Sequence, residues 1–256
     1  MNAARENPAT ELGARHNSRV PGLAGLDAPR QMRSRPGATR GRISDYVYDE
    51  LCEAIRSLRL QPGASLSEPA VASWLNVSRA PVREAFARLV EHGLVSVVPQ
   101  VGSQVAPISM QEVGDAVFIR NALETSAFQQ AIGAAELNTT RIQQLVDENR
   151  EAAARNDLEA FFETDEQLHH QVFTLAGVPH LWQFIRGTKL QLDRLRRMNL
   201  EAAIANEEIV HEHQQIVDAL IRRDEAVGVQ VIHQHSSRIL FDTEKLRGEF
   251  PDYFES

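Results

Sequence analysis

Histidine is the residue type in this sequence with the greatest capacity for site chemistry. The 256 residues include nine histidines, several of them adjacent to or two residues from another, and a single cysteine. In a helix, residues i and i+4 share a face, whereas residues i and i+2 lie on nearly opposite faces. Only one histidine of each close pair can therefore join the apolar face of its helix. This test selects His169, His213 and His235, together with Asp165 one turn before His169.

These four side chains come from three predicted helices and would converge in an apolar interior. Burying polar groups there is costly unless a partner satisfies them. A divalent metal ion is such a partner, and three imidazoles with one carboxylate suit Zn²⁺, with Ni²⁺ and Mn²⁺ as alternatives, leaving coordination positions open. The periodicity leaves open a second interpretation, a hydrogen-bonded core network without metal.

The helices that carry these residues belong to a region that follows Pro107. Apolar residues recur there at helical spacing, and breaks rich in Gly, Pro, Asn and Asp divide the pattern. Long helices joined by short turns pack as an antiparallel bundle. The predicted helices span residues 110–133, 139–155, 157–176, 180–200, 206–223 and 225–246.

Residues 43–106 show a different pattern, which predicts a winged helix-turn-helix. A first helix begins near Ser44 and is ended by a Pro-Gly pair. Two short helices follow at about 68–75 and 80–92, each with a proline in its first turn, where it is tolerated. Two β-branched runs within 94–107 then predict a hairpin. No other strand is expected in the chain, so the fold class is mainly α.

The third of these helices presents Arg79 and Arg83 near its exposed amino-terminal turn. A recognition helix enters the major groove by that end, and a guanidinium can hold guanine or phosphate through two hydrogen bonds. We therefore expect both arginines to contact DNA. The spacing alone equally allows an ordinary surface helix, in which Arg83 pairs with a neighbour such as Glu84.

Charge is distributed unevenly along the chain, whose formal net charge is −8. Residues 1–42 carry eight arginines and three acidic residues, whereas residues 43–256 carry 19 basic and 32 acidic ones. Since non-specific affinity for nucleic acid comes largely from neutralising phosphates, any DNA contact here must be local. The first 42 residues are rich in Pro, Gly, Ser, Asn and Arg, which predicts a disordered basic tail.

Two classes of protein are excluded by the hydrophobic pattern. No apolar run approaches the roughly 18 residues that a membrane span needs, and the amino terminus lacks the apolar core of a secretory signal. We therefore expect a cytoplasmic protein with no membrane partner.

The region from Leu58 to Val105 closely resembles the DNA-binding domain of the GntR family of bacterial regulators. The motifs PGxxLSE, VSRxPVREA and GLV followed by a wing glycine are all present in order. The resemblance implies that Ser78, Arg79 and Arg83 contact the major groove and that the wing tip around Gly102 approaches the minor groove. Asn76 replaces the usual turn glycine, which is acceptable because Asn tolerates a left-handed backbone.

The segments DEQLHHQVF, HEHQQIVDALIRRD and VIHQH resemble the metal-binding form of the FCD ligand-binding domain in the FadR-type subgroup of that family. Matched residue by residue, the implied metal ligands are Asp165, His169, His213 and His235, the four that periodicity also selects. Relatives with this site commonly respond to small carboxylates such as sugar acids and hydroxy acids. The resemblance therefore implies a small organic acid as effector.

Three arginines are candidates for holding that acid. Arg120 lies on the apolar face of its helix, and a buried arginine needs an acidic partner. That partner is either Glu124, one turn on, or the carboxylate of an effector. Arg194 and Arg196, on an arginine-rich helix, are the further candidates.

The sequence thus predicts a homodimeric DNA-binding regulator, a repressor more often than an activator, of a catabolic operon. Dimerisation is expected because paired half-sites raise operator affinity. One alternative is a metal-responsive regulator in which the ion is the signal. Another is a mononuclear metalloenzyme, which lacks a separate general base and leaves the winged helix unexplained. The expected domains are a tail at 1–42, the winged helix-turn-helix at 43–106, and an all-helical effector-binding and dimerisation domain at 107–250.

Overall fold

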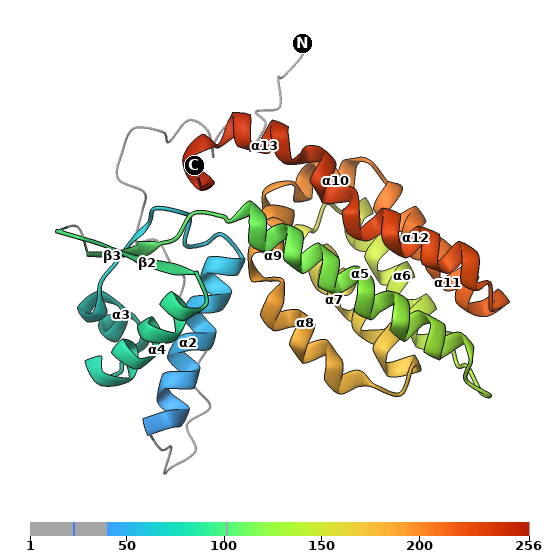
Figure 1. Cartoon of the computed structure of the whole chain (residues 1–256), viewed down its shortest axis with the longest axis horizontal. Coiled ribbons are helices and arrows are strands. Elements are labelled where there is room, and N and C mark those ends of the chain that lie inside the picture. Colours follow the sequence, from blue (N-terminus) through green and yellow to red (C-terminus); the bar gives the residue numbers. More distant parts are fainter. Residues whose placement is uncertain (1–22, 24–39, 101, 256) are drawn as a thin grey trace. The chain divides into compact units, whose positions relative to one another are not determined.

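Two compact units make up the computed structural model, which describes residues 23, 40–100 and 102–255 (Figure 1). The first unit groups residues up to Ser109 with Lys245–Ser256, and the second is Met110–Glu244. Most of the predicted tail at 1–42 lies outside the described residues, although its last three residues form the start of a helix.

The first unit is a winged helix-turn-helix, as predicted. Helices α2 and α4 pack against each other, α3 packs on α4, and a three-stranded antiparallel sheet has the order β1-β3-β2. The expectation of a hairpin alone was incomplete, because a third strand of two residues pairs with β3; so short a strand shows no alternation in sequence. The elements are α2 (Arg40–Arg56), β1 (Ser65–Leu66), α3 (Glu68–Leu75), α4 (Arg79–Glu91), β2 (Val95–Val98) and β3 (Gly102–Val105).

The turn between α3 and α4 fixes the start of the predicted recognition helix. Asn76 takes up the left-handed conformation expected of it, with φ 53° and ψ 47°, and ends α3. At the other end of α3, the Ser67 side chain accepts a hydrogen bond from the Ala70 amide, which caps the helix. Two local features therefore fix the ends of α3: the Ser67 cap at its start and the left-handed Asn76 at its end.

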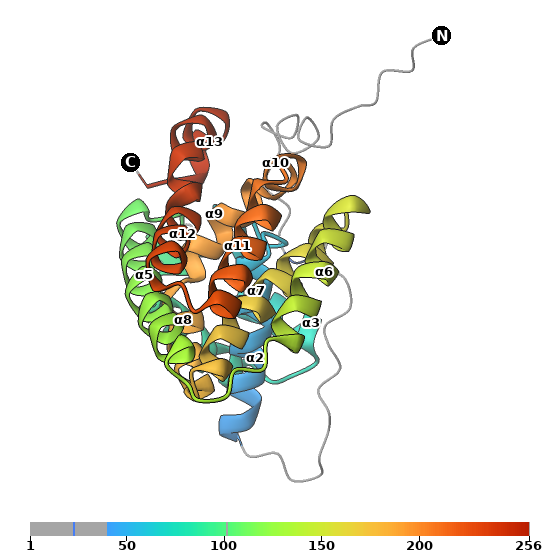
Figure 2. The same ribbon diagram turned by 90° about the vertical axis from the view of Figure 1, so that its right-hand side faces the viewer.

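The second unit is all-helical, with neighbouring helices packed side by side (Figures 1 and 2). No helix among the described residues combines the length and apolarity needed to cross a membrane. The helices are α5 (Met110–Ile132), α6 (Thr140–Ala154), α7 (Leu158–Leu175), α8 (Trp182–Thr188), α9 (Leu190–Met198), α10 (Leu200–Ala205), α11 (Glu208–Arg222) and α12 (Glu225–Ser237), with short 3₁₀ turns η2 (Pro179–Leu181) and η3 (Arg238–Asp242), and α13 (Thr243–Glu249) leads out of the unit.

Two predicted helices are interrupted in the structure. The helix expected at 180–200 is broken at Lys189, whose buried ammonium bonds to Glu166 at 2.6 Å and Asp193 at 2.7 Å. A buried cation needs such partners, and the break lets one side chain reach both. The helix expected at 225–246 ends at Ser237 and continues as the tighter η3 turn.

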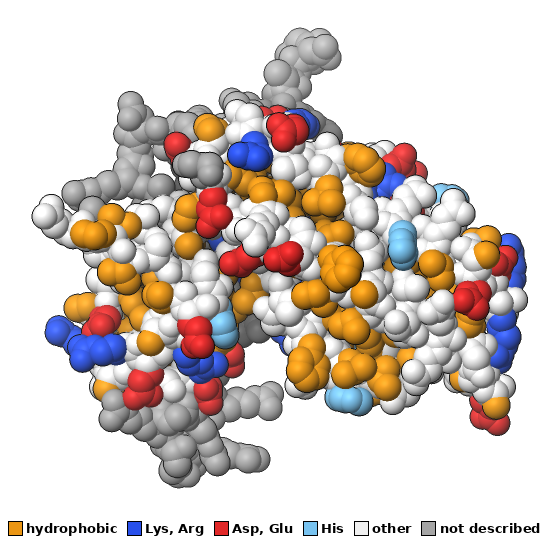
Figure 3. All heavy atoms as spheres, viewed as in Figure 1, with side chains coloured by type: hydrophobic (Ala, Val, Ile, Leu, Met, Phe, Trp, Pro, Cys, Tyr) orange, Lys and Arg blue, Asp and Glu red, His pale blue; other side chains and the backbone are white. Residues whose placement is uncertain are grey.

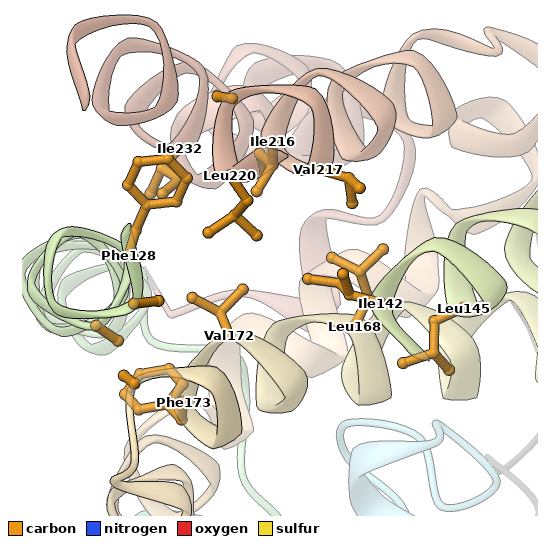
Figure 4. Close-up of a cluster of buried hydrophobic side chains, with 14 of the residues drawn as sticks. Phe128, Ile142, Leu145, Leu168, Val172, Phe173, Ile216, Val217, Leu220 and Ile232 are labelled. Atoms are coloured by element: carbon orange, nitrogen blue, oxygen red, sulfur yellow. The ribbon is translucent and has the colours of Figure 1, made fainter. Parts of the chain in front are cut away.

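A hydrophobic core joins helices α5, α6, α7, α11 and α12 (Figure 4). Phe128 of α5 is fully buried in this core, and α12 approaches so closely that a Cβ added at Gly228 would lie 2.0 Å from the Phe128 ring. Glycine is therefore required for the spacing of α5 and α12. Arg120 and Glu124 lie two turns and one turn before Phe128 on α5, and His235 lies two turns after Gly228 on α12, so that spacing also positions these polar residues.

Candidate metal centre and nucleic-acid interface

The four predicted metal ligands lie together in the helical unit. Asp165 and His169 come from α7, His213 from α11 and His235 from α12. Each offers one ligand atom, and these atoms lie within 4.8 Å of one another. All four side chains are buried, with at most 8% exposure. Helical periodicity therefore identified the inward-facing member of each histidine pair.

Carboxylates fix the proton position on two of the imidazoles. Nδ1 of His169 lies 2.9 Å from Glu124 Oε2, and Nδ1 of His235 lies 3.1 Å from Glu212 Oε2. An ionised carboxylate only accepts hydrogen bonds, so each Nδ1 must carry the proton. The Nε2 atom of each neutral ring is then left as an acceptor that faces the centre of the cluster.

An amide fixes the third imidazole in the same way. Asn149 donates from Nδ2 to the Phe161 carbonyl and to Thr164 Oγ1, each at 2.9 Å. Its Oδ1 therefore faces Nδ1 of His213, 3.1 Å away, and can only accept. His213 thus carries its proton on Nδ1 and presents an unprotonated Nε2.

The centre therefore holds several hydrogen-bond acceptors, namely the imidazole Nε2 atoms and the Asp165 carboxylate, and too few donors to satisfy them. Nε2 of His169 accepts from Arg120 Nη2 at 2.6 Å and lies 3.0 Å from Nε2 of His235. Nε2 of His213 lies 3.3 Å from Asp165 Oδ1 without forming a hydrogen bond. Acceptors that face each other in a buried site repel unless a cation lies among them. The donor set and its protonation therefore fit a divalent metal ion.

Burial and neighbouring charges set the same protonation state. Burial lowers the pKa of His169, and it lowers the pKa of His235 to about 3, so both rings are neutral. Burial alone would raise the pKa of Asp165, but the positive charge of Arg196 outweighs it and holds the pKa well below its usual range. Neutral imidazoles and an ionised carboxylate are the forms that bind metal.

A cavity of about 290 Å³ opens beside the centre. Arg120, Asp165, Arg196 and His235 all contribute to its wall, so two predicted metal ligands and two predicted effector contacts face the same space. Arg194 does not line the cavity; it is buried and donates to Gln191 Oε1 at 2.7 Å. The remaining wall is largely apolar, with Phe161, Leu200, Ala202, Ala203, Ile209, Ile239 and Phe241, and carries the polar residues Asn199, Asn206, Ser236, Arg238 and Asp242.

The two cavity arginines predicted as effector contacts are held by acidic partners. Arg120 Nε donates to Glu124 Oε1 at 2.6 Å, which is the first of the two partners considered for it, and Nη2 lies 2.6 Å from His169 Nε2. Arg196 bonds to Asp165 and donates to Glu166 Oε1 at 3.1 Å. Both guanidiniums therefore remain at the cavity wall next to the metal ligands.

Several residues that the sequence analysis did not assign to the site complete it. Glu212 and Asn149 orient His235 and His213, and Arg238 of η3 pairs with Glu212 at the cavity wall. One signal was available for Asn149, because it follows Ile142, Leu145 and Val146 on the apolar face of α6. A buried amide on such a face indicates a specific hydrogen-bond partner.

The predicted DNA contacts lie on the surface of the winged-helix unit. Ser78 precedes α4, Arg79 begins it, and both are exposed. Arg83 is 74% exposed at its side chain and pairs with Glu68 of α3 through bonds of 3.1 and 3.2 Å, not with Glu84. Gly102, at the start of β3, is exposed with φ +109°, a conformation that favours glycine.

Comparison with known proteins matches both units to families of regulators. The model described as bacterial regulatory proteins, gntR family, matches residues 43–105, and the FCD domain model matches residues 115–238. An uncharacterized HTH-type transcriptional regulator in unstable DNA locus of Streptomyces ambofaciens is 34% identical over 218 residues, covering 84% of this chain and 92% of its own. The HTH-type transcriptional repressor RspR of Escherichia coli (strain K12) is 33% identical over 213 residues, covering 83% and 93%. Among solved structures, E. coli McbR/YncC has a TM-score of 0.66 at 22% identity, over 79% of this chain and 98% of that one, which is a likeness of fold.

The convergent lone pairs generate a first prediction. Purified protein is expected to carry about one divalent metal ion per chain, and His213→Ala is expected to lose it, because one of three imidazole ligands is removed. Elemental analysis after dialysis measures both. His211→Ala, an exposed position on the same helix, is the control and should retain the ion. Absence of metal from the unaltered protein would contradict the site.

Proposed function

The chain belongs to the GntR family of bacterial regulatory proteins, with an FCD domain as its helical unit, and we propose that it represses a catabolic operon in response to a small organic acid bound beside a divalent metal ion. It is a DNA-binding transcriptional regulator and not an enzyme, so the metalloenzyme alternative was wrong. Its place of action is then the cytoplasm, where the bacterial chromosome lies. Repression is supported by the relative named as a repressor.

One observation carries the sensing part of this proposal: unprotonated Nε2 atoms and an ionised carboxylate converge beside a cavity that three arginines line. Asp165, His169, His213 and His235 would hold the ion, which when bound supplies positive charge and open coordination positions. Zn²⁺ is our first choice for this donor set, and Ni²⁺ and Mn²⁺ are the alternatives. Glu124, Asn149 and Glu212 keep the three imidazoles in the tautomer that can bind it.

Arg120 and Arg196 are the residues that we propose to hold the effector carboxylate. A guanidinium matches a carboxylate through two parallel hydrogen bonds, and both arginines lie at the cavity wall. The cavity volume of about 290 Å³ suits a small molecule. Arg194 is left out of this site because it lies away from the cavity wall, beside Gln191.

Operator recognition is assigned to the exposed start of α4 and to the wing. Ser78, Arg79 and Arg83 are exposed at the start of α4, the end by which a recognition helix enters the major groove, and Gly102 is exposed at the start of β3, which supports this assignment. Glu68 holds the Arg83 guanidinium through two hydrogen bonds and so limits its rotamers before DNA arrives.

A homodimer is supported by an apolar surface on the helical unit. Phe118 of α5 is 75% exposed and Phe184 of α8 is 67% exposed, and the two helices pack against each other. Figure 3 shows hydrophobic side chains gathered over α5 and α8. Because exposed aromatic clusters mark interfaces and symmetric dimers use one patch twice, we assign this surface to a second copy of the chain.

The DNA assignment predicts that Arg83→Ala weakens operator binding roughly 10- to 100-fold, because a two-pronged contact is lost. The exposed pair with Glu68 contributes little to stability, so circular dichroism should show an unchanged fold. A mobility-shift titration at fixed salt measures the affinity. Arg59→Ala, an exposed arginine outside α4, serves as control, and equal affinities for the two variants would refute the recognition-helix assignment.

The effector assignment predicts that a small carboxylate stabilises the metal-loaded protein. At a concentration 100 times its dissociation constant, a ligand adds about 2.7 kcal/mol, or roughly 5–10 °C in melting temperature. A thermal-shift screen of sugar acids and hydroxy acids, with and without chelator, measures this, and the chelator should shrink the shift. The neutral amide of each acid is the matched control. An equal shift from the amide would argue against recognition of a carboxylate.

Metal retention and operator titrations separate effector sensing from the metal-sensing alternative. An ion that is retained through dialysis is structural, whereas weak and titratable binding that changes operator affinity makes the ion the signal. Operator titrations with dialysed protein, with added Zn²⁺ and with chelator distinguish these two outcomes.

The dimer assignment predicts that Phe118→Asp lowers the self-association constant at least tenfold, since a charge would be buried in an apolar interface. Light scattering across a concentration series measures the mass. Ile221→Asp, at an exposed apolar position on α11, should leave the dimer intact. If Phe118→Asp dimerises as strongly as the unaltered protein, the dimer interface does not include the surface around Phe118.

A further inference from the structure

The C-terminal segment of the chain returns from the helical unit to the winged-helix unit. Residues 245–256 group with the winged helix, although the residues directly before them belong to the helical unit. The chain therefore passes between the units twice, after Ser109 and after Glu244. The second connection is not required to complete either unit's predicted fold.

The returning segment is attached at one defined point. The Ile108 amide donates to the Tyr253 carbonyl at 2.7 Å, and the Glu255 amide donates to the Ile108 carbonyl at 3.1 Å, which forms a parallel bridge between Ile108 and Phe254. Ile108, Tyr253 and Phe254 are all buried. Ile108 lies in the short connection between β3, the last strand of the wing sheet, and α5.

The same segment begins at the wall of the cavity. His235 of α12 is a proposed metal ligand, and Arg238, Ile239, Phe241 and Asp242 of η3 line the cavity. From Asp242 to Tyr253 the chain is helical apart from Phe250, through α13 and the 3₁₀ turn η4 (Pro251–Tyr253). A helical connection cannot absorb a displacement as a flexible linker would.

We propose that residues 243–255, here called the C-terminal strap, carry the state of the metal and effector site to Ile108, and so to the connection that joins the wing sheet to the helical unit. This inference rests on the proposed function, because it names the route by which that site acts. A ligand that engages Arg238 or Asp242 shifts η3, the strap follows, and the pairing at Ile108 tightens or loosens. Coupling of this kind is reciprocal: a change at Ile108 must also alter the site.

Amide hydrogen exchange tests the forward direction with Zn²⁺ alone as the probe. The Ile108 and Glu255 amides are both hydrogen-bond donors in the pairing, so their exchange rates report it. We expect these rates to change about fivefold or more between chelator-treated and zinc-loaded full-length protein, the lower end of typical coupling. Unchanged rates in protein that elemental analysis shows to contain zinc would overturn the inference.

A pair of variants tests the reverse direction without any ligand. Glu255→Pro removes the N–H that bonds to Ile108, and Phe254 already has the extended backbone, φ −113° and ψ 152°, that a residue before proline prefers. Glu255→Ala keeps the N–H and is the matched control. We expect Glu255→Pro alone to raise amide exchange across residues 238–242 about fivefold.

The two arms separate the failure of the strap from the failure of the metal site. Absence of zinc from every sample refutes the proposed metal site, and the variant pair then still decides whether the strap is coupled to the cavity wall. Equal exchange across residues 238–242 in Glu255→Pro and Glu255→Ala would show that the pairing only anchors the C-terminus.

Discussion

The helical unit is organised around lone pairs that face one another at its centre. Each of three imidazoles carries its proton on Nδ1 and donates it in a hydrogen bond directed away from the centre: those of His169, His213 and His235. Three Nε2 atoms and the Asp165 carboxylate therefore point toward the centre. Arg120 bonds to His169 Nε2 and Arg196 bonds to Asp165, but the Nε2 atoms of His213 and His235 have no cationic donor among the described residues, which is unfavourable in a buried site. The outward bonds meanwhile reach α5, α6 and α11, so the same side chains fix the relative positions of these helices.

The winged-helix unit, in contrast, depends on a few charged groups that are exposed to solvent. The chain is acidic overall, with a formal net charge of −8, so bulk attraction to DNA is weak and recognition depends on a few exposed groups. Arg83 is such a group, and its pairing with Glu68 restrains it on the surface. Because each subunit alone binds DNA weakly, a second subunit strengthens operator binding: once one subunit is bound, the other binds at a high effective concentration. The apolar surface around Phe118 and the sparse basic charge of the DNA-binding unit thus favour the same assembly.

Periodicity predicted which residues face inward on a single helix. It missed the helix breaks and strand pairings that depend on contacts with distant parts of the chain. It selected the inward histidines, and the backbone preference of Asn76 predicted the left-handed turn. Lys189, at the helix break, bonds to Glu166, a residue 23 positions earlier on another helix, and the pairing of Ile108 with Phe254 joins segments almost 150 residues apart. Neither leaves a local pattern, because each partner is ordinary in its own sequence context. Strand β1 was missed for a related reason, since its pairing with β3 is the feature that defines it.

Charge balance links the metal to the acid that we propose as effector. The ionisable groups bonded in and around the centre comprise six carboxylates and four cations, while His169 and His235 are neutral. The metal-free cluster therefore carries a net negative charge and disfavours an anion, and a dication offsets that charge. Binding of the ion and of a carboxylate should then favour each other, which is a coupling free energy and requires no change of shape. The carboxylates are Glu124, Asp165, Glu166, Asp193, Glu208 and Glu212, and the cations are Arg120, Lys189, Arg196 and Arg238.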